Sequence, residues 1–154
     1  MAEYSAPNRQ IINPGESVVF TTTVIPCNRG FVMFRNNSGV FVLVGYVPYV
    51  ACCPCAQKNA IYAADFGANI AVPEGQTVGP ISVALTLEGS TLQDTVMTVT
   101  PAAVEEFFNI SRATSVSVFR GCCETFSVKN ISSIPIAMTN ANVVLTRPDL
   151  VMSR

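Results

Sequence analysis

The sequence contains no histidine and no tryptophan, and few of its residues carry a charge. Without histidine the chain has no Ser-His-Asp or Cys-His catalytic group, no histidine metal ligand, and no side chain whose unperturbed pKa lies near neutrality. Charged residues make up 12% of the 154 residues, about half of the roughly 25% in ordinary soluble domains. A free monomer has too few charges to coat its surface, so the composition predicts a subunit of an assembly.

Other missing patterns exclude further classes of function. The 9 basic residues are scattered singly and are balanced by 10 acidic ones, so no basic stripe can follow a phosphate backbone, and we expect no nucleic-acid partner. There is no Gly-rich phosphate loop, and we expect no cofactor and no metal. The longest uncharged stretch, residues 36–57, is interrupted by glycine and proline, so we expect no membrane span.

Paired carboxylates are the catalytic chemistry that this composition leaves open. Glu105 and Glu106 are sequence neighbours and cannot face each other on a helix. Nothing in the sequence marks any other pair, so we expect no enzymatic activity. The acidic residues considered for such a pair are Asp65, Glu74, Glu88, Asp94, Glu105, Glu106, Glu124 and Asp149.

Short alternating apolar runs, separated by turn residues, predict an all-β fold. The clearest run covers residues 81–87, with one side expected to face the core and the other to face solvent. About nine or ten strands and one short helix, at 101–108, indicate a jelly roll in which two antiparallel sheets pack face to face. An immunoglobulin-like sandwich is the alternative. We expect a single domain at 11–147, a flexible or partner-bound arm at 1–10, and a C-terminal tail at 148–154.

Two continuously apolar segments flank the turn Asn36-Asn37-Ser38-Gly39, which predicts a hairpin. A strand that is apolar on both sides must be covered on both sides. We therefore expect one side of this hairpin to lie in a subunit contact. The candidate contact residues are Phe31, Val32, Met33, Phe34, Val40, Phe41, Val42, Leu43 and Val44.

Six cysteines form the remaining unusual pattern, and their even number and loop positions favour disulfides. Adjacent residues on a strand point to opposite sides, so Cys122 and Cys123 suit one bond inside the subunit and one to a neighbour. A zinc site, a redox centre at the CxxC spacing, and free or buried thiols are the alternatives. The disulfide candidates are Cys27, Cys52, Cys53, Cys55, Cys122 and Cys123.

Four segments in order carry a resemblance to a known family: GANIAVPEGQTVGPISVAL (67–85), TVTPAAVEEFFN (98–109), RGCCETFSVKNIS (120–132) and NANVVLTR (140–147). Together they resemble small structural proteins encoded in phages and prophages of gut Firmicutes, which look like trimeric jelly rolls of the tumour-necrosis-factor and complement-head type. The resemblance covers roughly residues 10–147, contains no catalytic motif, and does not account for the cysteines at 52–55.

This resemblance implies a structural role at the surface of a virion, as a capsid decoration, a head fibre or a fibre head, or a spore-surface module. The expected partners are further copies of the chain, as a homotrimer, and other virion or surface structural proteins. The expected location is the virion surface or the extracellular space.

Two other functions stay open. One is a lectin-like module that binds glycans through Tyr46, Tyr49 and Tyr62, which lie near the cysteine-rich loop in sequence. The other is a disulfide-linked subunit of a bacterial or spore surface filament.

Overall fold

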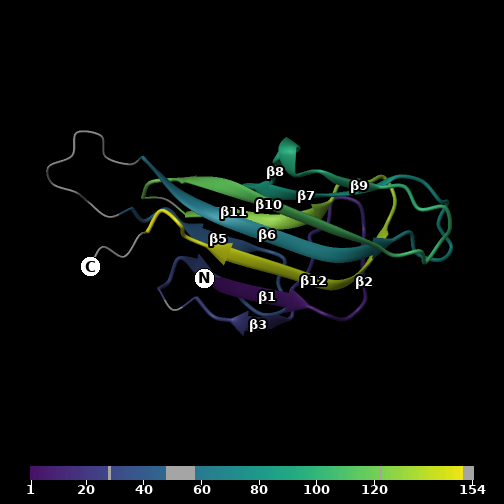
Figure 1. Ribbon diagram of the computed structural model, residues 1–154, viewed down its shortest axis with the longest axis horizontal. Coiled ribbons are helices and arrows are strands. Elements are labelled where there is room, and N and C mark those ends of the chain that lie inside the picture. The colour runs from purple at the N-terminus through teal and green to yellow at the C-terminus, as the bar shows by residue number, and fades with distance from the viewer. Residues whose placement is uncertain (28, 48–57, 122, 151–154) are drawn as a thin grey trace, which may run out of the picture.

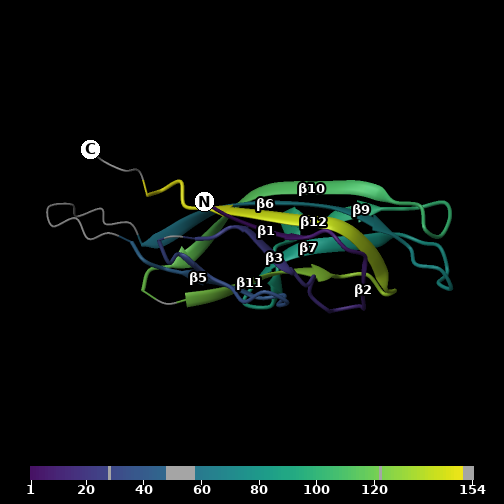
Figure 2. The same ribbon diagram turned by 90° about the horizontal axis from the view of Figure 1, so that it is seen from below.

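The computed structural model describes residues 1–27, 29–47, 58–121 and 123–150. They form a sandwich of two antiparallel sheets (Figures 1 and 2). The strands are β1 (Ala2–Ala6), β2 (Gln10–Ile12), β3 (Thr22–Ile25), β4 (Val32–Met33), β5 (Phe41–Val44), β6 (Asn59–Ala71), β7 (Ile81–Leu87), β8 (Ser90–Thr91), β9 (Met97–Val99), β10 (Phe108–Phe119), β11 (Cys123–Asn130) and β12 (Ile136–Thr146).

The two sheets differ in strand length and composition. The first, here called the long-strand sheet, has the order β10-β6-β12-β1-β3, with β2 also paired to β12. The second, the short-strand sheet, has the order β4-β5-β11-β7-β8, with β9 also paired to β7. From β5 to β12 the chain crosses repeatedly between the sheets, as in a jelly roll. The predicted all-β jelly-roll class is confirmed, and so is the hairpin, formed by β4 and β5.

An aromatic cluster from both sheets fills one part of the core. The ring of Phe41 on β5 lies 4.9 Å from Tyr4, 5.3 Å from Phe20, 4.5 Å from Phe34 and 6.1 Å from Phe126, measured between ring centroids. Tilted and offset ring pairs at such distances add to the stabilisation from burial. The cluster fixes the N-terminal strand and the hairpin against the same core.

The N-terminal segment is part of this core, which corrects the expectation of a flexible or partner-bound arm at 1–10. Its strand β1 lies between β12 and β3 in the long-strand sheet. Ala2, Tyr4 and Ala6 are buried in alternation. The period of two was present in the sequence, but two of the three inward residues are alanines, which carry little hydrophobic signal.

The helix expected at 101–108 is also absent. Glu105 has a positive φ of 58°, which a right-handed helix does not allow. The Glu106 carboxylate accepts hydrogen bonds from the backbone N–H groups of Ala102 and Ala103, at 3.0 and 3.2 Å, and so closes a turn. The short helix in the described residues is instead a single 3-10 turn, η1 (Gln93–Thr95).

Strand β7 is not one-sided as its alternation suggested. Ile81, Val83 and Leu85 are buried, but so are Ala84 and Thr86 on the other side. The Thr86 and Ser127 hydroxyl groups lie 2.5 Å apart and share a hydrogen bond. Because the two hydroxyl groups are hydrogen-bonded to each other, burying the second side of the strand leaves neither of them without a partner and costs little free energy.

We predict that Tyr4→Ala destabilises the fold by roughly 3–5 kcal/mol, the cost of removing a large aromatic side chain from a core. Tyr4 is 3% exposed and contacts both Phe34 and Phe41. Chemical unfolding measures the loss, with Ser5→Ala on the outward side of the same strand as the matched control. If residues 1–10 were a detachable arm, the two variants would unfold at the same denaturant concentration.

Candidate functional site

The described residues contain no cluster of three or more metal-ligating side chains. Among their carboxylates, Glu88 and Glu124 come close enough to interact: burial first, and then the Glu88 charge, raise the pKa of Glu124. However, the Glu88 carboxylate is already used as an acceptor for the backbone N–H of Thr125, at 2.6 Å. Glu105, which was also considered for a catalytic carboxylate pair, forms an ion pair with Arg9. These contacts give both carboxylates structural roles.

The outward side of the long-strand sheet is an uncovered surface. In Figure 2 its strands β10, β6, β12 and β1 form the upper layer, and no other described helix or strand lies above them. We call its outward side chains on β1, β6, β10 and β12 the outer face. They are Glu3, Ser5, Asn59, Ile61, Ala63, Asp65, Gly67, Asn69, Asn109, Ser111, Ala113, Ser115, Ser117, Phe119, Asn142, Val144 and Thr146.

Small and uncharged side chains dominate this outer face. Its two charges, Glu3 and Asp65, are both acidic, and they lie in one row across the sheet, with Val144 between them in register. Asn142 donates a hydrogen bond to the Glu3 carboxylate at 2.8 Å. Phe119, at one end of the face, is 70% exposed. A nearly uncharged sheet surface with an exposed aromatic ring is typical of a protein contact rather than of a solvated face.

The edges of the sheets are unequally protected. The edge strands β4 and β8 of the short-strand sheet have two residues each, and β9 has three. At β3 the pairing register with β1 shifts between Glu3 and Tyr4. By contrast, β10 pairs with β6 over 12 residues without a shift, and no described strand pairs with its other side. Short strands and irregular pairing protect edges against association, and β10 has neither.

The sequence predicted that the hairpin forms a subunit contact, but the fold buries some of its residues in the core and exposes others. Phe41 and Leu43 are completely buried, and Val32 is 8% exposed, so these three belong to the core of this same chain. Met33 and Val40 are exposed, whereas Phe31, Phe34, Val42 and Val44 are partly buried. The exposed side of the hairpin borders an open groove of about 550 Å³, lined by Met33, Phe34, Arg35, Asn36, Asn37, Ser38, Val40 and Val42.

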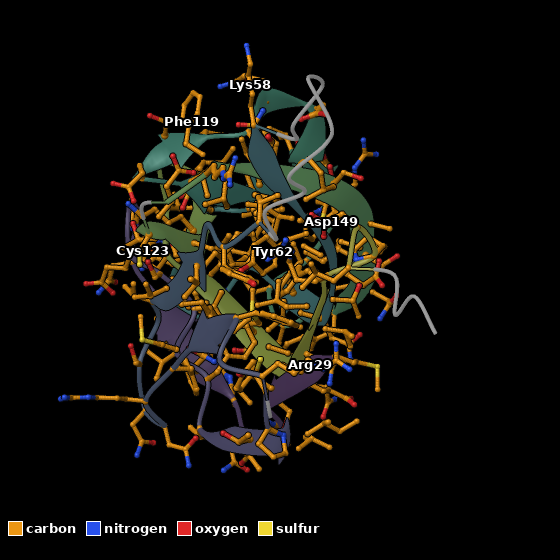
Figure 3. All side chains as sticks on the ribbon, turned by 90° about the vertical axis from the view of Figure 1, so that its left-hand side faces the viewer. Arg29, Lys58, Tyr62, Phe119, Cys123 and Asp149 are labelled. Atoms are coloured by element: carbon orange, nitrogen blue, oxygen red, sulfur yellow. The ribbon has the colours of Figure 1, made fainter. Side chains whose placement is uncertain are left out.

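Most of the cysteine candidates lie outside the described residues: Cys52, Cys53, Cys55 and Cys122. Of the others, Cys27 is half-buried with a free thiol, and Cys123 is exposed at the start of β11. Figure 3 views this end of the sandwich and shows Cys123 at its periphery. The disulfide pairing therefore stays a prediction.

The same end of the sandwich contains a buried ion pair that the sequence did not reveal. Arg147 binds Asp149 through its Nε and Nη2 atoms, at 2.8 and 2.9 Å, and donates to the Tyr46 carbonyl oxygen at 2.9 Å. Its guanidinium lies over the rings of Phe31 and Tyr62, at 5.3 and 5.0 Å from their centroids. Contacts to two aromatic faces and a bidentate carboxylate hold the charge in place.

Tyr62 is therefore a core residue and not a glycan-binding one, which corrects part of the lectin hypothesis. It is completely buried, its hydroxyl lies 2.9 and 2.6 Å from the carbonyl oxygens of Phe31 and Val44, and burial raises the pKa of its phenol. Figure 3 shows it toward the centre of the sandwich. Tyr46 is 57% exposed, and Tyr49 lies outside the described residues.

A scan against protein-family models and a search of curated proteins give no match. Among solved structures, the chain is similar to the globular domain of zebrafish complement 1qA protein, with 10% identity, a TM-score of 0.58, and coverage of 93% of this chain and 94% of that one. At this identity the similarity concerns the fold alone.

Two weaker matches carry no argument. They are pika GITRL, with 10% identity, a TM-score of 0.43 and coverage of 94% and 96%, and a family 35 carbohydrate-binding module from Clostridium thermocellum, with 12% identity, a TM-score of 0.35 and coverage of 88% and 97%. Within the described part of the chain, no helix is long and apolar enough to cross a membrane.

We predict that Asp149→Asn destabilises the protein by about 3–5 kcal/mol, because it leaves the buried Arg147 guanidinium without its counter-charge. The Arg147 side chain is 1% exposed. Thermal unfolding of this variant, compared with Asp94→Asn at an exposed position, measures the effect. Equal melting temperatures would show that the ion pair contributes nothing to stability.

We predict that Glu124→Gln stabilises the protein at pH 7 by roughly 0.5 kcal/mol, because burial and, second, the Glu88 charge disfavour the ionised Glu124 carboxylate. Because the folded protein holds the Glu124 proton more tightly than the unfolded chain, the charged form opposes folding above the ordinary glutamate pKa of about 4.3. The gain should disappear below about pH 4, where wild-type Glu124 is also neutral. Urea unfolding of both proteins at both pH values measures the difference in their free energies of unfolding. A stabilisation that persists in acid would exclude this electrostatic cause.

Proposed function

We propose that this protein is a homotrimeric jelly-roll module that acts as a non-enzymatic structural subunit at the surface of a virion. The observation that carries the proposal is the outer face of the long-strand sheet. It is uncovered and nearly free of charge, in a chain with few charges elsewhere. A second copy of the chain buries this face without having to desolvate many ionised groups.

The size of the outer face suits a subunit contact. Strands spaced about 4.8 Å apart and rising about 3.4 Å per residue give four strands an area on the order of 600 Å². A stable interface buries about 800 Å² on each partner, so the face and a bordering edge together reach that value. Alanine, glycine and serine side chains let a neighbouring backbone approach closely, while Phe119, Ile61 and Val144 provide apolar anchors.

A three-fold arrangement is supported by the resemblance of the four sequence segments to trimeric jelly rolls. It also suits the unequal surfaces of the protomer. In a three-fold ring each subunit uses two different patches, one toward each neighbour. Here one patch is the outer face, and the other is the adjoining sheet edge at β10, which is long, regularly paired with β6 and carries a single charge, Arg112.

The virion location rests on the same segment resemblance. The exposed side of the β4–β5 hairpin is a second contact surface, for another structural component of the particle. Met33 and Val40 are exposed there beside an open groove. Because the hairpin and the outer face lie on different sheets, a trimer can use both surfaces at once.

We predict that the purified protein has about three times the chain mass of 16.4 kDa in light scattering at micromolar concentration, and that Ala63→Arg dissociates it. An arginine at this half-buried position places a long charged side chain in the middle of the outer face. Ser90→Arg, at an exposed turn of the other sheet, is the matched control and should leave the mass unchanged.

In the same experiment, Val40→Arg distinguishes the role of the hairpin from the role of the outer face. It should leave the trimer intact, because the hairpin is assigned to a different partner. A wild-type monomer at micromolar concentration contradicts the proposed function. A trimer lost in Val40→Arg but kept in Ala63→Arg moves the subunit contact to the hairpin.

A further inference from the structure

The outer face and the edge strand β10 beside it carry charges of opposite sign. Asp65 is exposed at the centre of the face, between Ala113 on β10 and Val144 on β12 in register. Glu3 lies beyond Val144 in the same row. The face therefore carries two negative charges and no positive one.

The bordering strand β10 carries one charge, and it is positive. Arg112 lies next to Ala113 in sequence but on the opposite side of the strand, in register with the inward-facing Phe66. Because β10 is an edge strand, Arg112 is nevertheless exposed at the side of the sandwich. The ion pairs within the described residues are Arg9–Glu105 and Arg147–Asp149, so Asp65 and Arg112 do not pair within one protomer.

We propose that Arg112 of one protomer pairs with Asp65 of the next, with Glu3 beside it, when copies of this chain assemble. The inference rests on the proposed homotrimer and names the contact that sets its register and direction. A buried Asp65 without a partner would oppose association strongly. In a head-to-tail ring, the edge of one subunit meets the face of its neighbour, and the charge on that edge is the one that Asp65 requires.

This ion pair gives the assembly specificity. Between two flat faces of small residues, many relative positions bury similar apolar area. One fixed cation and one fixed anion favour a single position, and like charges penalise contacts of two faces with each other. A face-to-face dimer whose two-fold axis passes near this row places Glu3 and Asp65 of both copies together, and the repulsion disfavours that arrangement.

Charge reversal tests the pairing in the full chain. Asp65→Arg and Arg112→Asp should each raise the dissociation constant of the trimer at least about tenfold, measured by sedimentation at several concentrations. The double variant should recover most of the affinity. Matched reversals at exposed positions, Glu74→Arg and Lys58→Asp, should assemble like the wild type.

Mixing the two single variants provides a second readout. In a mixed three-membered ring, two of the three contacts join opposite charges and the third joins like charges, whereas all three contacts join like charges in a ring of either variant alone. The mixture should therefore assemble at concentrations at which each variant alone is monomeric. Circular dichroism and melting of the dilute monomers check folding. A pair within one protomer would change the monomer's melting temperature and would not respond to mixing.

The outcomes separate the two proposals. If the wild type is trimeric but both single variants assemble normally, or the double variant is as weak as the singles, the Arg112–Asp65 contact is wrong and the trimer stands. If the wild type is monomeric, both proposals fail. Recovery in the double variant and in the mixture, with unaffected controls, supports the contact.

Discussion

The alternation of side chains along a β-strand is the constraint on which the rest of this structure depends. Every inward residue that builds the core commits its neighbour to the opposite side of the sheet. In the long-strand sheet the inward set includes Tyr4, Tyr62 and Phe66, and the outward set is mostly small and uncharged. The short-strand sheet covers only the inward side of the long-strand sheet, so the outer face follows from the same alternation that builds the core.

Two sets of side-chain contacts hold the chain segments of the sandwich together. The aromatic cluster around Phe41 ties the N-terminal strand to the hairpin. At the opposite side of the hairpin, Arg147 and Asp149 connect the end of β12 to the rings of Phe31 and Tyr62. These contacts hold the long-strand sheet against the hairpin, and a surface that is already held in place loses little entropy when another copy packs against it.

Much of the fold could be predicted from the short alternating apolar runs, of which residues 81–87 are the clearest, and from the turn at Asn36 to Gly39. Strand β1 could not, because Ala2 and Ala6 are too small to mark a core strand. Of the candidate contact residues at the hairpin, Val32, Phe41 and Leu43 are used by the core, whereas Met33 and Val40 are exposed, and for these a contact with another subunit or partner stays a prediction. The outer face gave no sequence signal, because serines, alanines and asparagines become a surface only when four strands lie side by side.

The central claim is that the outer face is buried between copies of this chain. Carboxyl labelling with a water-soluble carbodiimide, read out by mass spectrometry across a range of protein concentrations, tests it most directly. Asp65 and Glu3 should react when the protein is dilute and become protected as it assembles, while the exposed Glu74 and Asp94 react equally throughout. Labelling of Asp65 that stays as fast as that of Glu74 at every concentration would contradict the account.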